Sequence, residues 1–327
     1  MAKRAPVPDC PASPHEIVFT RYRARSRPCW PPLQCKTRPE TQTMRSVQTL
    51  QSNLSFGEAP RWRPGEGLYF SDIHAQRVLL QRLDGELEEI AAFDGPVSGL
   101  GWLPDGRLLV VSMHDRRLLR RDADGEFRSH ADLSEVASWH ANDMVVDRDG
   151  VAYVGNFGFS IAPRREEARP ANLARVSPGG AVSVAAGELW FPNGAVISPD
   201  GRTLVIGESA ARRLTAFTIA ENGELVDRRL WAQMPGNAFP DGICLDEEGA
   251  IWVASPATRE VLRLAEGGTL LERIETEQMA VAVMLGGPRR RTLFVCTAES
   301  TDPEFCKTTR TARLLAIEVD VAGAGQP

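Results

Sequence analysis

The sequence lacks several features that would place it in large classes of protein. No uninterrupted apolar run approaches the ~18 residues that a membrane-spanning helix needs, so the sequence contains no candidate for one. Its formal charge is −5, with 38 basic and 43 acidic residues, and this leaves no basic excess of the kind that binds nucleic acid. We therefore expect neither a membrane nor a nucleic acid as a partner.

Several chemical motifs are also missing. There is no CxxC pair for a zinc ribbon or a redox centre, no GxSxG nucleophile elbow, no HExxH helix, no P-loop and no dinucleotide fingerprint after a strand. Cys244 and Cys296 lie in strand-like runs, where we expect small core side chains. This use of cysteine predicts a reducing compartment and a cytoplasmic protein.

Residues 1–45 differ from the rest. They hold 8 of the 23 prolines and an excess of arginine, without helical or strand periodicity and without the apolar core of a secretory signal. We predict a disordered N-terminal extension here and a short tail at 323–327. Organelle targeting is an alternative for the extension, and so is a natural start at Met44.

The remainder, 46–322, is a repeat. Short apolar runs follow Asp-Gly, Pro-Gly and Asn-Gly turns, which is typical of hairpins. Six segments align at spacings of 40 to 51 residues, and a period of this length with several short strands predicts a six-bladed β-propeller. We expect residues 312–320 to pair with 46–54 and close the ring.

The alignment also predicts a site. The second residue of each segment begins the innermost strand of a blade, beside the central channel; these residues are Glu58, Ser98, Asn142, Asn193, Asp241 and Val281. Four of them carry an amide or a carboxylate, an all-oxygen set that suits Ca²⁺ or Mg²⁺ and not a nitrogen–sulfur zinc site. The alternative is that these polar side chains only cap strand ends.

The segments GEAPRW, HANDMVVDRDG, WFPNGAVISPDGRTLV and FPDGICLDEEGAIWVA resemble the SMP-30/gluconolactonase family over residues 50–300. The resemblance implies a propeller that hydrolyses sugar lactones with a divalent metal in its channel. It implies Glu58, Asn193 and Asp241 as metal ligands and Asn142 as a ligand or substrate contact. Two positions depart from the family: His140 replaces an arginine that contacts sugar hydroxyls, and Ala59 replaces a glycine.

We therefore expect a metal-dependent lactonase that opens a sugar lactone or a related small lactone with a metal-activated water. Asp241 is the first candidate for the general base, with Asp143 and His140 as alternatives. Asn142, His140 and His114 are candidate substrate contacts. Ca²⁺ is the first candidate cation, with Mg²⁺, Mn²⁺ and Zn²⁺ as alternatives, and we expect a monomer.

Two other functions fit the same residues. One is a phosphotriester or fluorophosphate hydrolase, because the same oxygen set can activate water towards phosphorus. The other is a propeller that binds a metabolite without catalysis around a structural metal. For Phe157, Phe159 and Trp190 we expect packing within the blades, with a place at the channel entrance as the alternative.

Overall fold

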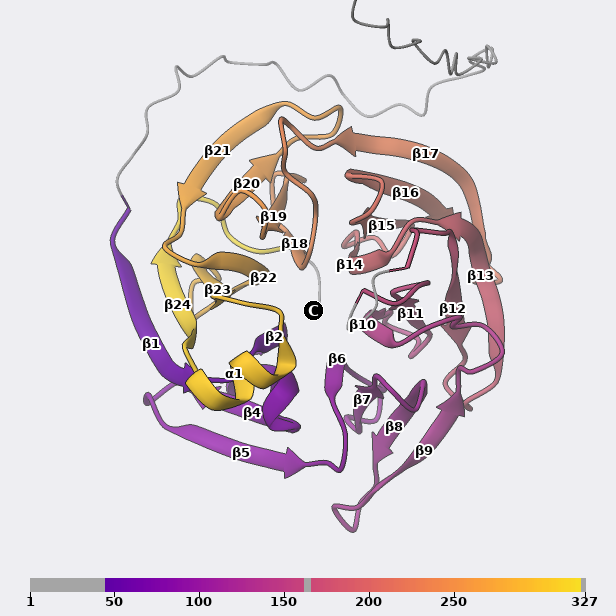
Figure 1. Ribbon diagram of the computed structural model, residues 1–327. Coiled ribbons are helices and arrows are strands. Elements are labelled where there is room, and N and C mark those ends of the chain that lie inside the picture. The colour runs from indigo at the N-terminus through magenta and orange to yellow at the C-terminus, as the bar shows by residue number, and fades with distance from the viewer. Residues whose placement is uncertain (1–44, 162–165, 325–327) are drawn as a thin grey trace, which may run out of the picture. The chain divides into compact units, whose positions relative to one another are not determined.

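The described chain forms a ring of six sheets around a central channel (Figure 1). The structure is a computed structural model that describes residues 45–161 and 166–324. Each sheet in these ranges has four antiparallel strands, and consecutive strands of the chain lie side by side from the channel outward. The six-bladed propeller predicted from the repeat is confirmed.

The four layers of strands are as follows. The innermost strands are β2 (Gly57–Arg63), β6 (Val97–Trp102), β10 (Ala141–Val146), β14 (Pro192–Ile197), β18 (Ile243–Leu245) and β22 (Met279–Gly286). The second strands are β3 (Gly67–Asp72), β7 (Leu108–Ser112), β11 (Ala152–Asn156), β15 (Thr203–Glu208), β19 (Ile251–Ser255) and β23 (Thr292–Ala298). The third are β4 (Arg77–Arg82), β8 (Arg117–Arg121), β12 (Ala171–Val176), β16 (Arg213–Ile219), β20 (Glu260–Leu264) and β24 (Ala312–Glu318). The outermost are β5 (Leu87–Ala92), β9 (Phe127–Asp132), β13 (Val182–Leu189), β17 (Leu225–Gln233), β21 (Leu270–Glu275) and β1 (Val47–Leu54).

The ring closes through its last blade. Strand β1, from the start of the described chain, pairs with β24, with Val47 opposite Ile317 and Leu54 opposite Ala312. This is the predicted closure, and it covers the outer edge of β24. The predicted extension over residues 1–45 lies outside the described residues except for Arg45, which pairs with Glu272 and with Asp320.

Hydrophobic side chains fill the space between neighbouring blades. Trp62 of the first blade stacks on Phe294 of the last, with ring centroids 5.7 Å apart. Gly286 makes room for this contact, since a Cβ there would lie 2.6 Å from the indole. Cys244 and Cys296 are free, buried thiols of the same core cluster, as predicted. Close packing of this kind fixes the blades around the channel.

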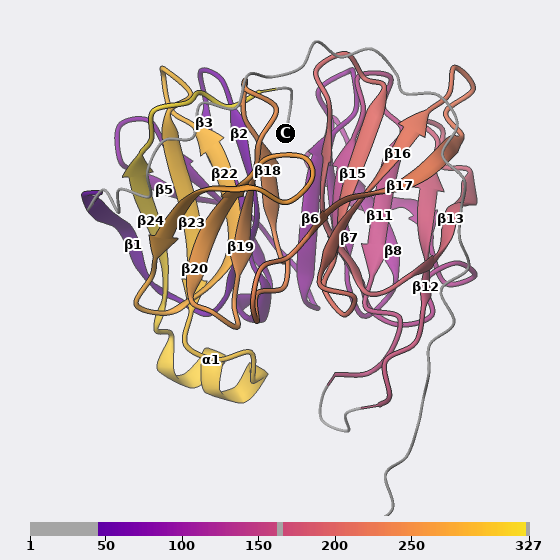
Figure 2. The same ribbon diagram turned by 90° about the horizontal axis from the view of Figure 1, so that it is seen from above.

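One short α-helix was not predicted. Helix α1 (Pro303–Thr309) follows β23 and lies on the face of the ring where the innermost strands begin (Figure 2). Asp302 caps it by accepting a hydrogen bond from the Phe305 amide over 2.8 Å, and Pro303 occupies its first turn. A single 3₁₀ turn, η1 (Ile73–Ala75), contacts it. None of the helices in the described ranges is both long and apolar enough to cross a membrane.

Candidate functional site

The innermost strands are irregular at the positions that the sequence alignment singled out. The pairing register shifts between Glu58 and Arg61 in β2, and equivalent shifts follow the first residues of β6, β10, β14 and β22. A β-bulge bends its strand and changes the direction of the side chains. In these strands, the repeated bulge therefore gives the side chain of the second residue a direction that a regular pleated strand would not give it.

Glycines beside the candidate residues let neighbouring blades approach each other. Gly194 follows Asn193, and a Cβ on it would lie 2.6 Å from the backbone oxygen of Asp241. The Gly194 amide donates to that same oxygen over 3.3 Å, and the Gly242 amide donates to the Val281 oxygen over 2.8 Å. These backbone contacts between blades hold the candidate side chains at the channel.

Four polar side chains from four blades form one chain of hydrogen bonds. Ser98 Oγ donates to Asn142 Oδ1 over 3.4 Å, and Asn142 Nδ2 donates to Asn193 Oδ1 over 2.8 Å. Asn193 Nδ2 then donates to Asp241 Oδ1 over 2.5 Å. Asp241 itself precedes β18 instead of lying within it, and the residue is half-buried. The predicted convergence of Asn142, Asn193 and Asp241 is thus present in the structure.

Glu58 interacts with the other residues of the set through its charge. Its carboxylate is buried and accepts a hydrogen bond from the Ala59 amide over 2.8 Å. Burial, with Asp241 and then Asp143 as negative neighbours, raises the pKa of Glu58 well above its usual range. Burial likewise raises the pKa of Asp241 to about 7, and the charge of Asp143 adds to the shift while the Asn193 hydrogen bond opposes it.

Asp143, an alternative candidate for the general base, is in a buried ion pair. Its Oδ1 accepts from Arg61 over 2.7 Å and from the Met144 amide over 2.8 Å. Arg61 also donates to the Pro60 and Met144 backbone oxygens. Burial raises the pKa of Asp143, although Arg61 opposes this shift. The Asp143 carboxylate is therefore paired with Arg61, whereas the Asp241 carboxylate accepts a hydrogen bond from the neutral amide of Asn193.

The donor set fits a hard divalent cation. Glu58, Asp143 and Asp241 together carry three negative charges when ionised, and Arg61 carries one positive charge. All three partners are close enough to Glu58 to shift its pKa. The remaining double negative charge matches a divalent ion, and carboxylate and amide oxygens are its usual ligands. In residues 45–161 and 166–324, no three side chains of His, Cys, Asp or Glu form a group that could hold a metal ion. The candidate set differs from such a group because two of its four members, Asn142 and Asn193, are amides.

The two candidate histidines lie together next to this set. His114 and His140 have ring centroids 4.1 Å apart, and His140 precedes Asn142 by two residues. Burial lowers the pKa of His140 to about 4, and His114 and Arg116 add to the shift, so the imidazole is neutral at pH 7. Burial also lowers the pKa of His114. Both rings can therefore donate or accept one hydrogen bond without bringing a charge.

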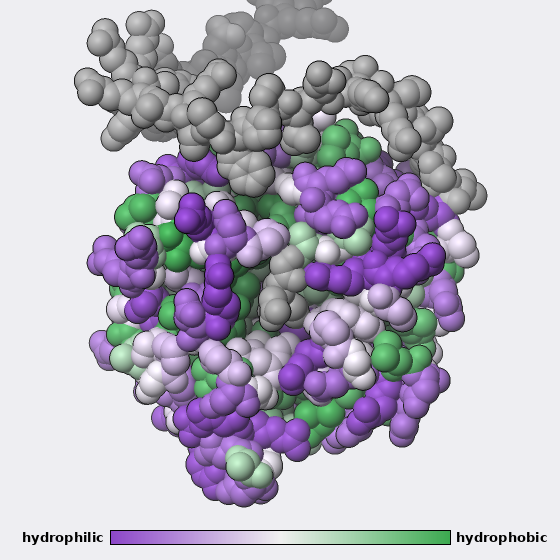
Figure 3. Space-filling view, turned by 180° about the vertical axis from the view of Figure 1, so that it is seen from behind, coloured by the Kyte–Doolittle hydropathy of each residue, from purple (hydrophilic) through white to green (hydrophobic). Residues whose placement is uncertain are grey.

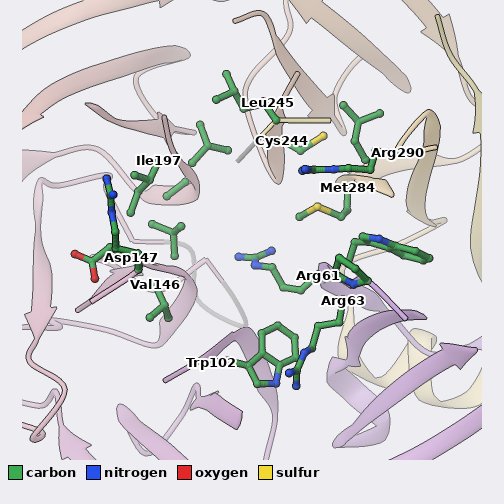
Figure 4. A pocket seen from close by; sticks show the side chains of 18 of the residues that line it. Arg61, Arg63, Trp102, Val146, Asp147, Ile197, Cys244, Leu245, Met284 and Arg290 are labelled. Atoms are coloured by element: carbon green, nitrogen blue, oxygen red, sulfur yellow. The ribbon is translucent and has the colours of Figure 1, made fainter. Parts of the chain in front are cut away.

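The other end of the channel is different in character. It widens into a cavity of about 410 Å³ that includes Arg61, Arg63, Trp102, Ile197 and Leu245 (Figure 4). None of the four candidate metal residues lines it. Figure 3 shows the molecule from this side, where hydrophilic and hydrophobic residues are mixed across the face of the ring. Arg61 both lines this cavity and pairs with Asp143.

Sequence reasoning missed Arg61. It lies three residues after Glu58 in the GEAPRW segment, and no spacing rule shows that the bulge brings it to Asp143. Ser98 stood in the alignment, but its hydrogen bond to Asn142 was not anticipated. Only the position of Ser98 in the aligned segments could have indicated this hydrogen bond.

Comparison with known proteins decides the family. Residues 56–299 match the family model described as SMP-30/Gluconolactonase/LRE-like region. The chain belongs to this family. It is 27% identical over 296 residues to the 6-deoxy-6-sulfogluconolactonase of Pseudomonas putida, covering 88% of this chain and 98% of that protein.

Solved structures give the same result for the fold. A gluconolactonase of Xanthomonas campestris superposes with a TM-score of 0.69 at 26% identity, covering 85% of this chain and 91% of that one. A calcium-binding protein, regucalcin, of Agrobacterium tumefaciens gives a TM-score of 0.73 at 22% identity, covering 86% and 97%. The family expected from the four sequence segments is therefore confirmed.

Proposed function

We propose that the protein is a metal-dependent lactonase whose site is formed by Glu58, Asn142, Asn193 and Asp241. The observation that carries the proposal is the chain of hydrogen bonds from Asn142 through Asn193 to Asp241, beside the buried carboxylate of Glu58. It brings oxygen ligands from separate blades to one end of the channel. The lactonases among its relatives, and the relative named calcium-binding, support the reaction class and Ca²⁺ as the first cation to test.

The chain's own residues account for the proton transfers. The Asp241 carboxylate would accept a proton from the attacking water. Its pKa of about 7 is that of the metal-free site, and a bound cation would lower it. As the bond between the carbonyl carbon and the ring oxygen breaks, the same carboxyl group returns the proton to the leaving oxygen, and a hydroxy acid results. A divalent cation held by the four oxygen-bearing side chains would polarise the lactone carbonyl and stabilise the charge that develops on its oxygen.

Asn193 orients the acceptor. Its amide nitrogen donates both to Asp241 Oδ1 and to Ser209 Oγ, the latter over 3.2 Å. Ser209 Oγ in turn donates to the Pro240 backbone oxygen over 2.7 Å. Asn193 therefore holds the Asp241 side chain, and Ser209 holds the backbone of the residue before it.

A lactonase assay tests the proposal. The full chain, stripped with chelator and reloaded with Ca²⁺, Mg²⁺, Mn²⁺ or Zn²⁺, is screened against γ- and δ-lactones by proton release. We expect turnover that requires a metal and falls at least ~100-fold in Asp241→Asn, since the substitution removes the proton acceptor. Asp227→Asn, an exposed position on the outermost strand β17, is the matched control. Activity that survives both chelation and Asp241→Asn refutes the proposal.

A further inference from the structure

On the α1 side of the ring, the residues where the innermost strands begin have aromatic, aliphatic or imidazole side chains. The residue two before each aligned channel position lies at or shortly before the start of an innermost strand, on the face of the ring where these strands begin. These six residues are Phe56, Pro96, His140, Phe191, Phe239 and Met279. None of the six has a carboxylate, an amide, a guanidinium or an ammonium group.

Contacts join several of these residues into a wall. His140 lies 6.1 Å from Phe157 and 4.1 Å from His114 between ring centroids, and Phe157 lies 4.5 Å from Phe191. We call His114, His140, Phe157 and Phe191 the entrance wall. His140 and Phe191 each precede a candidate metal residue by two positions, so the wall adjoins the proposed reaction centre.

The apolar surface continues around the entrance. Phe157 and Met279 are half-buried and pack against the hydrophobic cluster that contains Phe56 and Met113. Phe56 in turn contacts the ring of His74, with centroids 5.5 Å apart. A ligand that reached the oxygen set from this face would therefore pass mainly carbon.

The arginines of the neighbouring loops are used elsewhere. Arg116 donates to the Ala137 oxygen over 3.1 Å, Arg169 to the Gly158 oxygen over 2.9 Å, and Arg212 to the Ala238 oxygen over 3.1 Å. These guanidinium groups hold loop backbone. Lys307 of α1 pairs with Glu304 over 3.3 Å.

This surface discriminates between lactones. A polyhydroxylated lactone has several hydroxyl groups, and each one that leaves water without a hydrogen-bond partner weakens the binding of the lactone. An alkyl or aryl substituent gains affinity by leaving water against aromatic rings. We propose that the substrate is a lactone whose ring carries an apolar alkyl or aryl substituent, and not a polyhydroxylated sugar lactone. This inference rests on the lactonase function proposed above.

The test compares kcat/KM of the Ca²⁺-loaded full chain for four lactones. These are γ-butyrolactone, γ-nonalactone, dihydrocoumarin and glucono-δ-lactone. Each methylene buried by the wall gives up to about a fourfold gain, so γ-nonalactone should exceed γ-butyrolactone by at least about tenfold, with glucono-δ-lactone lowest. A preference for glucono-δ-lactone overturns the inference and leaves the lactonase proposal standing. Failure to turn over any lactone overturns both.

Two variants locate the preference in the wall. Phe157→Ala should lower the ratio of kcat/KM for γ-nonalactone to that for γ-butyrolactone by about fivefold or more. His140→Arg, which adds a charge without removing volume, should lower the same ratio and raise relative turnover of glucono-δ-lactone. Phe127→Ala, a half-buried aromatic on the outermost strand β9, is the matched control and should leave the ratio unchanged. Unchanged ratios in both wall variants contradict the inference even if one of them folds poorly.

Discussion

The guanidinium of Arg61 lies 2.7 Å from Oδ1 of Asp143, and both side chains are almost completely buried in the wall of the channel. The pair lies between the oxygen-rich end of the channel and the cavity at its other end. It compensates one of three neighbouring carboxylates and leaves the charge of the other two for a cation. The geometry of the site therefore depends on a residue outside the candidate ligand set.

Replacing Arg61 tests this dependence. Arg61→Met leaves Asp143 buried and unpaired beside Glu58 and Asp241, so we expect a loss of about 3–5 kcal/mol in the free energy of unfolding. Urea denaturation of the chelator-treated protein measures it. Arg82→Met breaks an exposed pair with Glu88 and should cost no more than ~1 kcal/mol. Equal losses in the two variants would contradict the role given to Arg61.

The two carboxylates of the candidate set should oppose stability and favour metal binding. Glu58→Gln and Asp241→Asn each remove a negative charge from a cluster of like charges, so the metal-free protein should become more stable, by about 1 kcal/mol. Calcium affinity, measured by calorimetry, should fall at least ~10-fold in each. Variants that lose stability and keep calcium affinity would show that these side chains only support the strands.

The pH dependence of the metal-free protein follows from the raised pKa values. Asp241 has a pKa of about 7 in the folded state, against about 3.9 in an unfolded chain. Its favourable contribution is therefore complete below the unfolded value and is lost as pH rises through about 7. The Tm of chelator-treated protein should fall between pH 5 and 8, and the rise in Tm caused by Ca²⁺ should grow over the same range. A calcium effect that is constant over this range would be inconsistent with this assignment.

Close approach of the blades gives a further prediction. Gly194→Ala places a Cβ within 2.6 Å of the Asp241 backbone oxygen, so the two inner strands must move apart. We expect a loss of about 2 kcal/mol in stability together with weaker metal binding. Gly95→Ala is the control, because nothing lies within 4 Å of its Cβ position. Both effects are measured by the same denaturation and calorimetry experiments.

The N-terminal strand should be essential to the ring. A chain that begins at Met44 keeps β1 and should match the full chain in Tm, whereas one that begins at Gly57 leaves the edge of β24 open. We expect the shorter chain to aggregate or to lose several degrees in Tm. Light scattering and thermal denaturation distinguish these outcomes. A stable monomer starting at Gly57 would show that β1 is dispensable.

Repetition explains how much could be predicted from the sequence. Six aligned segments fixed the number of blades and the channel positions of Asn142 and Asn193, because a repeat constrains distant residues at once. The alignment did not reveal that Asp241 lies before its strand, because aligned positions do not show where the backbone pairing of each strand begins.

Individual side-chain contacts could not be predicted from the sequence, for a physical reason. The Arg61–Asp143 pair joins residues 82 positions apart through a bulge, and such local irregularities have no periodic signature. The contact between the tilted rings of His114 and His140 joins two residues that lie outside strands, where no alternation predicts side-chain direction. Helix α1 has a local signal in the Asp302–Pro303 pair at its start, but its 7 residues are too few for a helical periodicity to stand out.

The central claim is that one divalent cation on the oxygen set is required for lactone hydrolysis. The most direct measurement titrates Ca²⁺ into chelator-stripped full chain and follows bound metal and lactone turnover in the same samples. The account predicts that both rise together and level off at one Ca²⁺ per chain, and that Asp241→Asn shows neither at the same concentrations. Full turnover before any Ca²⁺ is bound would contradict it.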